Sequence, residues 1–206
     1  MRSRGAYTSR QLRRASRGLP PRRVIIIVCE GARTEPSYFE GLRQRRRLRT
    51  AQVRVFPGRT SGNEPSTLIG FARKLQVEFP TAEVFCVFDY DGRPQIMELL
   101  DQCRAKPELR PVLSNPCVEL WFLLHYEYFA REETQQDLKR RLRAHIPRYE
   151  KLGTSLYDLL ESHQARALPR ARRLRENHEA LGRLPQANPS TSVDILVEVL
   201  YSLPIG

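Results

Sequence analysis

Acidic side chains follow two apolar runs of the chain at the point where each run ends. Residues 24–29 read Val-Ile-Ile-Ile-Val-Cys and are followed by Glu30, and residues 84–88 read Val-Phe-Cys-Val-Phe and are followed by Asp89 and, after one tyrosine, Asp91. Carboxylates that lie close together repel one another, and a divalent cation relieves that repulsion. The pattern predicts a Mg²⁺ or Mn²⁺ site with Glu30, Asp89 and Asp91 as metal ligands and catalytic groups.

The spacing of the second acidic pair suits two-oxygen metal binding. Side chains alternate along an extended strand, so Asp89 and Asp91 are expected to point to the same side. A lone Asp-x-Asp also occurs by chance in loops, and Glu30 at the end of a second buried run makes the pattern more specific. Gly31 allows the backbone to turn and a ligand to approach closely.

Two further glutamates are candidates for the same site. Glu35 lies near the start of an expected helix, where a carboxylate either compensates the helix dipole or serves as an additional metal ligand. Glu119 stands in the stretch Ser-Asn-Pro-Cys-Val-Glu-Leu-Trp of residues 114–121, among apolar neighbours. A carboxylate is costly to bury unpaired, so Glu119 needs a partner, a metal or a helix end, and we expect it at the catalytic site.

The apolar patterns predict the elements that position these residues. Strands are expected at 24–28, 52–56, 83–88 and 110–114, and helices at 35–49 (with Thr34 as its cap), 66–79 and 94–105. This alternation is typical of a mainly parallel α/β sheet with flanking helices, whose strands end at the edge where ligands bind. We expect a buried helix at 117–130. The remainder, 132–204, is expected to be helical without a strand of comparable quality, with a turn and cap at 188–191 and a last helix at 192–200.

Charge divides the chain into three parts. The net charge is +12, and residues 1–23 contribute eight arginines and no acid, which leaves +4 for the rest. We expect a disordered arginine-rich arm at 1–23, an α/β core at 24–130 and a helical C-terminal extension at 131–206 packed on the core. Arginine-rich segments bind phosphate backbones through charge, so the arm favours a nucleic-acid partner. A solvated tail is the plain alternative, and a mitochondrial presequence fits less well because no apolar face is evident.

Five cations of the body are candidates for nucleic-acid binding. They are Arg33, the basic cluster Arg45, Arg46 and Arg47, and Lys151.

Other classes of site find little support in the residue types. The four cysteines form no CxxC pair, which favours small core residues in a reducing cytoplasm. The four histidines lack ligand spacing, so a zinc site is not expected, and His125 is interpreted as a core-edge residue. Neither a P-loop nor a GxGxxG motif is present, which argues against nucleotide hydrolysis. No apolar stretch approaches membrane-spanning length, so no membrane partner is expected.

Four segments together resemble RloB-like proteins. They are residues 28–39, 88–91, 114–125 and 188–191, and they keep the order and approximate spacing of that family from residue 24 onward. The resemblance implies a relation to the Toprim domain, with its glutamate at Glu30 and its Asp-x-Asp pair at Asp89 and Asp91. Glu35 and Glu119 would be the additional acidic positions of nuclease-type variants. It also implies a bacterial phage-defence locus and an ATPase encoded nearby.

The expected activity is metal-dependent cleavage of phosphodiester bonds in DNA or RNA, by an effector of an abortive-infection system. Two alternatives remain open from the residues: a non-catalytic nucleic-acid-binding or sensor subunit of an ATPase-containing complex, and nucleotidyl transfer. Whether the chain forms an oligomer is also open.

Overall fold

The computed structural model describes residues 23–50, 52–58, 65–90, 92–93 and 95–205. Within them lies a five-stranded sheet of order β2-β1-β3-β4-β5, in which β5 alone runs antiparallel. The strands are β1 (Val24–Cys29), β2 (Val53–Phe56), β3 (Ala82–Asp89), β4 (Leu109–Asn115) and β5 (Ser190–Thr191). The expected α/β class with a mainly parallel sheet is confirmed.

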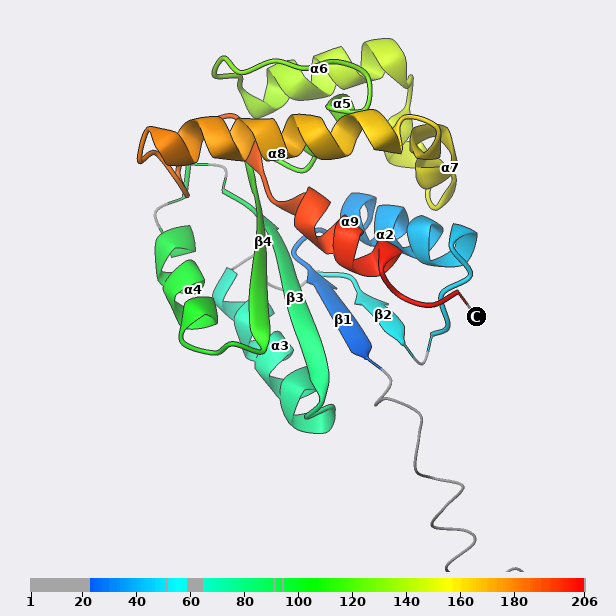
Figure 1. The fold of residues 1–206 in the computed structure, drawn as a ribbon, viewed down its shortest axis with the longest axis vertical. Helices are drawn as coiled ribbons and strands as arrows, with labels where there is room; N and C mark the ends of the chain where they lie inside the picture. The colour runs from blue at the N-terminus through cyan, green and yellow to red at the C-terminus, as the bar shows by residue number, and fades with distance from the viewer. Residues whose placement is uncertain (1–22, 51, 59–64, 91, 94, 206) are drawn as a thin grey trace, which may run out of the picture.

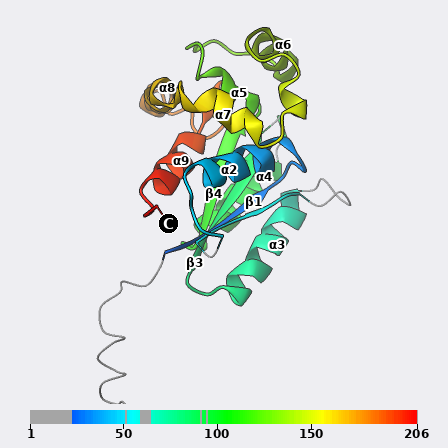
Figure 2. The same cartoon turned by 90° about the vertical axis from the view of Figure 1, so that its right-hand side faces the viewer.

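Helices cover both faces of this sheet (Figure 1). On one face lie α3 (Pro65–Glu78) and α4 (Gln95–Arg104), and on the other α2 (Thr34–Arg45) and the C-terminal helices. Figure 2 shows the sheet between α3 and α2. The strand residues explain the two layers, because Ile25 and Ile27 belong to one apolar cluster and Ile26 and Val28 to the other, as the period of two requires.

The chain reverses its direction of travel across the sheet between β1 and β3. From β1 it passes through α2 to the edge strand β2, and then through α3 to β3 on the other side of β1. The crevice at such a reversal, outside the carboxyl ends of the strands, is where ligands bind in open α/β sheets. Glu30 follows β1 and Asp89 ends β3, so both border this crevice.

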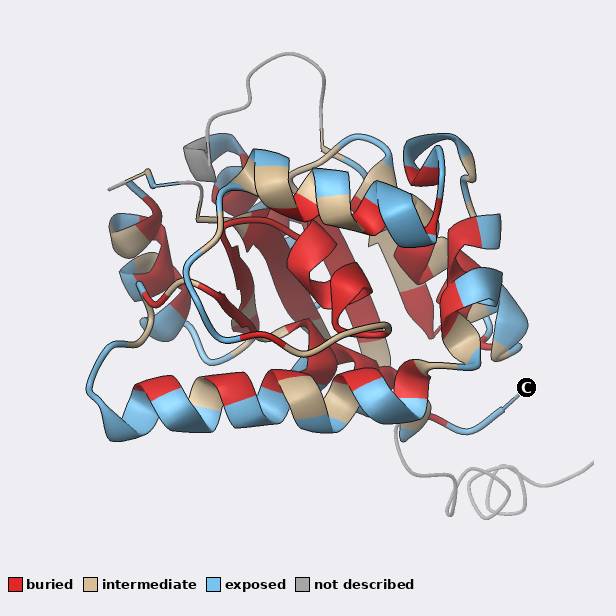
Figure 3. Ribbon diagram, turned by 90° about the horizontal axis from the view of Figure 1, so that it is seen from above, coloured by how far each residue is buried: buried red, intermediate tan, exposed pale blue. Residues whose placement is uncertain are grey.

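The C-terminal region completes the layer over α2. It comprises α5 (Glu119–Leu123), α6 (Gln135–His145), the 3-10 turn η1 (Tyr149–Lys151), α7 (Ser155–Glu161), α8 (Gln164–Ala180) and α9 (Val193–Tyr201). Figure 3 shows α5 buried, with exposed outer faces on the longer helices beside it. One apolar cluster includes residues of β1, α2 and all five of these α-helices, so this region and the sheet share a core.

Two helices are shorter than predicted. The buried helix expected at 117–130 is only α5, because Arg170 of α8 donates to the Leu124 carbonyl (2.7 Å) at its end. The helix expected to reach residue 49 ends at Arg45, where Arg47 takes a left-handed conformation (φ 52°) and the Leu48 amide bonds the Arg43 carbonyl (2.9 Å). This is a Schellman ending formed without glycine, which the sequence did not signal.

The N-terminal cap of α2 was predicted wrongly, and the turn and cap expected at 188–191 are present only in part. Thr34 is the first residue of α2, and Arg33 occupies the cap position without a side-chain bond. Asn188 and Pro189 form a bend, and the Thr191 hydroxyl accepts a hydrogen bond from the Val193 amide (3.3 Å) at the start of α9. Ser190 and Thr191 form β5 rather than a turn, because β4 has a free edge and the Thr191 hydroxyl lies 2.8 Å from that of Ser114.

Two predictions concern residues only partly described. The arm at 1–23 lies outside the described residues except for Arg23, which donates to Glu83 (Nη2 to Oε2, 3.0 Å). Among the described residues, no helix is long and apolar enough to cross a membrane.

Candidate active site at the carboxyl edge of the sheet

Glu30 and Asp89 are joined directly across the neighbouring strands β1 and β3. The Glu30 amide donates to the Val87 carbonyl (2.8 Å), and the Asp89 amide donates to the Glu30 carboxylate (Oε2, 3.3 Å). The parallel register of β1 and β3 therefore brings together two acids that are 59 residues apart. The sequence predicted this juxtaposition.

Glu35 is folded back against the turn that follows β1. A Cβ placed on Gly31 would lie 2.1 Å from the Glu35 carboxylate oxygen Oε2, so the glycine leaves the space that this carboxylate fills. Burial raises the pKa of Glu35, the backbone N–H of Glu35 itself lowers it, and Glu119 and Glu30 raise it further. The close approach expected at Gly31 is thus made by a side chain of the same protein.

Asp89 lies among three other carboxylates. Burial raises its pKa well above the usual range, and the negative charges of Glu35, Glu119 and Glu30 raise it further, while a hydrogen bond with the Val118 backbone lowers it. Four acids from β1, α2, β3 and α5 therefore share one electrostatic environment. Such perturbed carboxylates in a crevice are typical of functional sites.

Glu119 has one neutral and one cationic side-chain partner. It is 6% exposed, accepts a hydrogen bond from the Tyr149 hydroxyl (Oε1, 2.7 Å) and lies 3.8 Å from the Lys139 ammonium. These contacts supply the partners that a carboxylate among apolar neighbours requires, and the negative charge of Glu119 still acts on Asp89.

Glu30 is paired with a cation that the sequence analysis did not single out. Arg93, in the turn between β3 and α4, donates from Nη1 to Oε1 (2.6 Å) and from Nη2 to Oε2 (2.9 Å) of Glu30. Its Nη2 also donates to the Asp89 carbonyl (2.8 Å). This two-pronged pair neutralises one of the four acids.

The donor set suits a hard cation in chemistry, because it consists of carboxylate oxygens. Within the described parts of the chain, however, no three acidic, cysteine or histidine side chains are arranged to hold one metal ion. Asp91, expected as a ligand, lies outside the described residues, so its placement contributes nothing here.

The predicted nucleic-acid contacts are spread over the molecule. Arg33 is exposed beside Glu35, but Arg45, Arg46 and Arg47 lie at the other end of α2, about 18 Å away for twelve residues at 1.5 Å each.

The basic cluster at the end of α2 also has partners of its own, since Arg45 pairs with Glu161 (2.6 Å) and Arg46 donates to the Tyr201 carbonyl (3.1 Å). These three arginines are not brought to the acidic site. Lys151 is exposed in η1, two residues from Tyr149.

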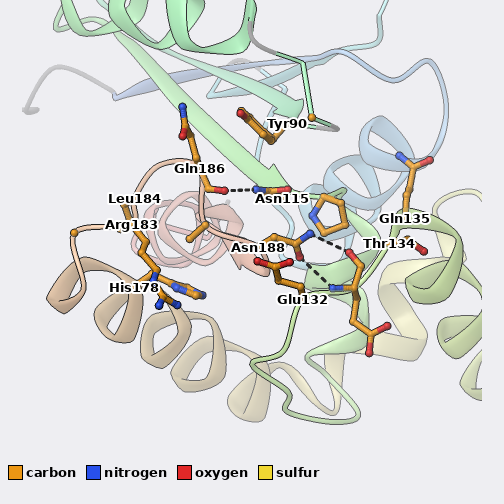
Figure 4. Close-up of a pocket in the computed structure, with 15 residues that line it drawn as sticks. Tyr90, Asn115, Glu132, Thr134, Gln135, His178, Arg183, Leu184, Gln186 and Asn188 are labelled. Carbon is orange, nitrogen blue, oxygen red and sulfur yellow. Dashed lines mark hydrogen bonds between the residues drawn. The ribbon is translucent and has the colours of Figure 1, made fainter.

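A polar cavity of about 810 Å³ opens along the same edge of the sheet. Its walls come from the ends of β3 and β4, the start of α6 and the segment between α8 and β5 (Figure 4). Asn115 donates to the Gln186 carbonyl (2.8 Å), and Asn188 donates to the Glu133 carbonyl (3.0 Å), so two amides fix these walls. Tyr90 lines the cavity immediately after Asp89.

His125 is buried inside the C-terminal layer, away from the solvent. Its Nδ1 lies 2.9 Å from the Trp121 carbonyl and its Nε2 3.2 Å from Gln164 Oε1, and burial lowers its pKa to about 4. It is a core histidine, as predicted. All four cysteines are free and buried.

Fold and site together define an α/β protein with an acidic crevice where the order of its parallel strands reverses. A family model described as RloB-like protein matches residues 25–200, and the chain belongs to that family. The comparisons with curated proteins and with solved structures gave no match.

Sequence reasoning missed Arg93, Lys139 and Tyr149. Arg93 had a usable signal, because it is four residues beyond the end of a buried strand and next to the acidic pair. Lys139 and Tyr149 had none, since they reach Glu119 only through the packing of α6 and η1 on α5.

Proposed function

We propose that this RloB-like protein cleaves phosphodiester bonds of DNA or RNA at the acidic crevice, in a reaction that depends on Mg²⁺ or Mn²⁺. The observation that carries the proposal is the gathering of Glu30, Glu35, Asp89 and Glu119 at one edge, with the pKa of Asp89 and of Glu35 raised. A cation bound there would offset the repulsion, activate water and stabilise charge on the phosphate.

The side chains would divide the work as follows. Asp89 and Glu35 supply anionic oxygen at the centre of the crevice, and Glu119 is oriented by Tyr149 and Lys139. Once its carboxylate is free of Arg93, Glu30 is available as a further metal ligand or, alternatively, for general acid–base work. The position of Asp91 next to this group in the sequence makes it a further ligand candidate.

Substrate binding would draw on both charge and shape. The arginine-rich residues 1–23 would supply a polycation, and Arg33 is an exposed cation two residues before Glu35. The cavity at Tyr90 is large enough for a nucleotide and offers an aromatic ring and amide groups, which suit a base beside the scissile phosphate. This favours single-stranded or unpaired nucleic acid.

The cellular setting is part of the same proposal. Free, buried cysteines fit a reducing compartment, which supports a cytoplasmic location for the proposed activity. As an RloB-like protein, the chain would act as the effector of a bacterial phage-defence system with an ATPase partner.

One observation favours a non-catalytic, nucleic-acid-binding or sensor subunit instead. Both oxygens of Glu30 are bonded to Arg93, and the described residues hold no ready group of three metal ligands. In that case the crevice would bind nucleic acid and signal to a partner without cleaving it.

End-labelled DNA and RNA incubated with the purified chain, with and without the ATPase, separate the two functions. Cleavage that requires Mg²⁺ or Mn²⁺, stops with EDTA and falls at least a hundredfold in Asp89→Asn supports the nuclease. The matched control is Asp101→Asn, an exposed carboxylate on α4 paired with Arg104. Tight binding without any cleavage would establish the non-catalytic alternative.

A further inference from the structure

Arg93 engages Glu30 in the manner in which arginine recognises a planar anion. Two nitrogens of the guanidinium meet two oxygens of the carboxylate at 2.6 and 2.9 Å, and one of these nitrogens also holds the Asp89 carbonyl at 2.8 Å. The fork thus ties the turn after β3 to the turn after β1. Such bidentate pairs are short and charge-assisted.

This pair stands between Glu30 and any cation. A divalent ion that is to use the Glu30 oxygens has to displace a positive group already bonded to both of them. Arg93 therefore already neutralises part of the negative charge in the crevice. Glu35 and Asp89, in contrast, face other carboxylates.

The guanidinium of Arg93 is also suited to bind a phosphate group. A phosphodiester presents two non-bridging oxygens to a guanidinium in the same bidentate fashion as a carboxylate. The Arg93 side chain keeps 30% of its surface exposed, while that of Glu30 keeps 15%, so the arginine is the more accessible member of the pair. Gly92, at φ 68°, precedes it in the turn.

We propose that Arg93 is a phosphate-binding residue whose transfer from Glu30 to a nucleic-acid phosphate frees Glu30 for a divalent cation. The inference rests on the acidic crevice of the proposed function and adds how that crevice is controlled. It makes nucleic acid and metal bind cooperatively, because each weakens the Glu30–Arg93 pair that opposes the other. The coupling is reciprocal, as linkage requires.

Binding of Mn²⁺, measured by electron paramagnetic resonance of the free ion, tests this without turnover. The probes are Mn²⁺ alone and Mn²⁺ with a cleavage-resistant phosphorothioate oligonucleotide, in DNA and in RNA form. For the unaltered chain we expect the oligonucleotide to tighten Mn²⁺ binding on the order of tenfold, within the usual range of coupling between sites. Arg93→Gln should bind Mn²⁺ about as tightly without the oligonucleotide as the unaltered chain does with it.

The matched control is Arg104→Gln, which removes an arginine from an exposed pair with Asp101 on α4 and should leave both Mn²⁺ affinities unchanged. Arg93→Lys keeps the charge but loses the fork, so it should show a weakened coupling and serves if Arg93→Gln does not fold. The proposal is overturned if the oligonucleotide leaves Mn²⁺ binding of the unaltered chain unchanged, or if Arg93→Gln matches that chain in both conditions.

The outcome is separable from that of the proposed function. Cooperative binding without cleavage of any substrate would remove the nuclease and leave the role of Arg93 standing. Metal-dependent cleavage together with Mn²⁺ binding that does not change in Arg93→Gln would support the nuclease and remove the proposed role of Arg93.

Discussion

Two neighbouring carboxylates of the same crevice should have opposite effects on stability. Glu30→Gln removes the negative charge that pairs with Arg93, whereas Asp89→Asn removes a charge that is repelled by three other acids. We therefore expect Glu30→Gln to lower the free energy of unfolding and Asp89→Asn to raise it. Both changes keep the shape of the side chain, so packing is nearly constant between them.

The size of each effect follows from the surroundings. Exposed ion pairs contribute about 0–1 kcal/mol, and breaking a buried pair costs about 3–5 kcal/mol. With 30% and 15% of the two side chains exposed, the Glu30–Arg93 pair is intermediate, and its loss should cost about 2 kcal/mol.

For Asp89 the sign follows from its pKa. The folded state binds the proton more tightly than the unfolded chain, so stability is lost as pH rises above the unfolded pKa and through the raised folded pKa. Above that window the ionised group destabilises the fold. Single stabilising substitutions commonly gain about 0.5–2 kcal/mol, and we expect Asp89→Asn to fall in this range.

Urea denaturation at pH 8 with EDTA measures both changes, and a melting curve should move about 2–4 °C per kcal/mol for a chain of this size. At pH 8 the gain from Asp89→Asn should be at its largest, and it should shrink on acidification. The argument fails if the two variants shift stability in the same direction. It also fails if Asp89→Asn is least stable, relative to the unaltered chain, at pH 8.

Three further outcomes are expected from other parts of the molecule. His125 should remain neutral at pH 5 when its titration is followed by NMR, because its pKa falls from 6.5 to about 4 on folding. For the same reason, about 3 kcal/mol of folding stability should be lost as the pH falls through that interval. A His125 that titrates near 6.5 would contradict this expectation. If the Tyr90 ring stacks on a base in the cavity, Tyr90→Ala should weaken binding of a single-stranded oligonucleotide by about 1–3 kcal/mol in fluorescence anisotropy, and Tyr90→Phe should not. Equal affinities of the two variants would argue against stacking. Gly31→Ala should destabilise the fold by about 1–3 kcal/mol in urea and much less when combined with Glu35→Ala, since the added methyl group meets the Glu35 carboxylate; the same cost in both backgrounds would exclude that clash.

The sequence was most informative where burial on both faces of a strand left a continuous apolar run. Such runs predict β1 and β3, and the edge rule for parallel sheets then predicts that Glu30 lies beside Asp89, as it does in the structure. Glu119 was predicted from the cost of burying a charge, and it proved to be 6% exposed and bonded to Tyr149.

The misses share a physical cause, which is that tertiary contacts decided local structure. The end of α5 depends on Arg170 from a helix 46 residues later, and β5 exists because β4 offers an edge to Ser190 and Thr191. Neither partner is visible in the local pattern. Residues 45–47 were predicted to bind nucleic acid on the basis of their charge alone. They lie at the end of α2, and α2 runs antiparallel to β1, so this end lies away from the carboxyl end of the strand and from the acidic site.

The position of α9 has a consequence for the order in which the chain can fold. Val193, Leu196, Val197 and Leu200 fill the same apolar layer as Ile25 and Ile27, nearly the whole described chain apart. Domains fold as units during synthesis at about 5–20 residues per second. The layer that α2 and α5 to α8 form over this face of the sheet therefore remains incomplete on the ribosome until residues 193–203 have emerged, and the apolar side chains of β1 lack these partners until then.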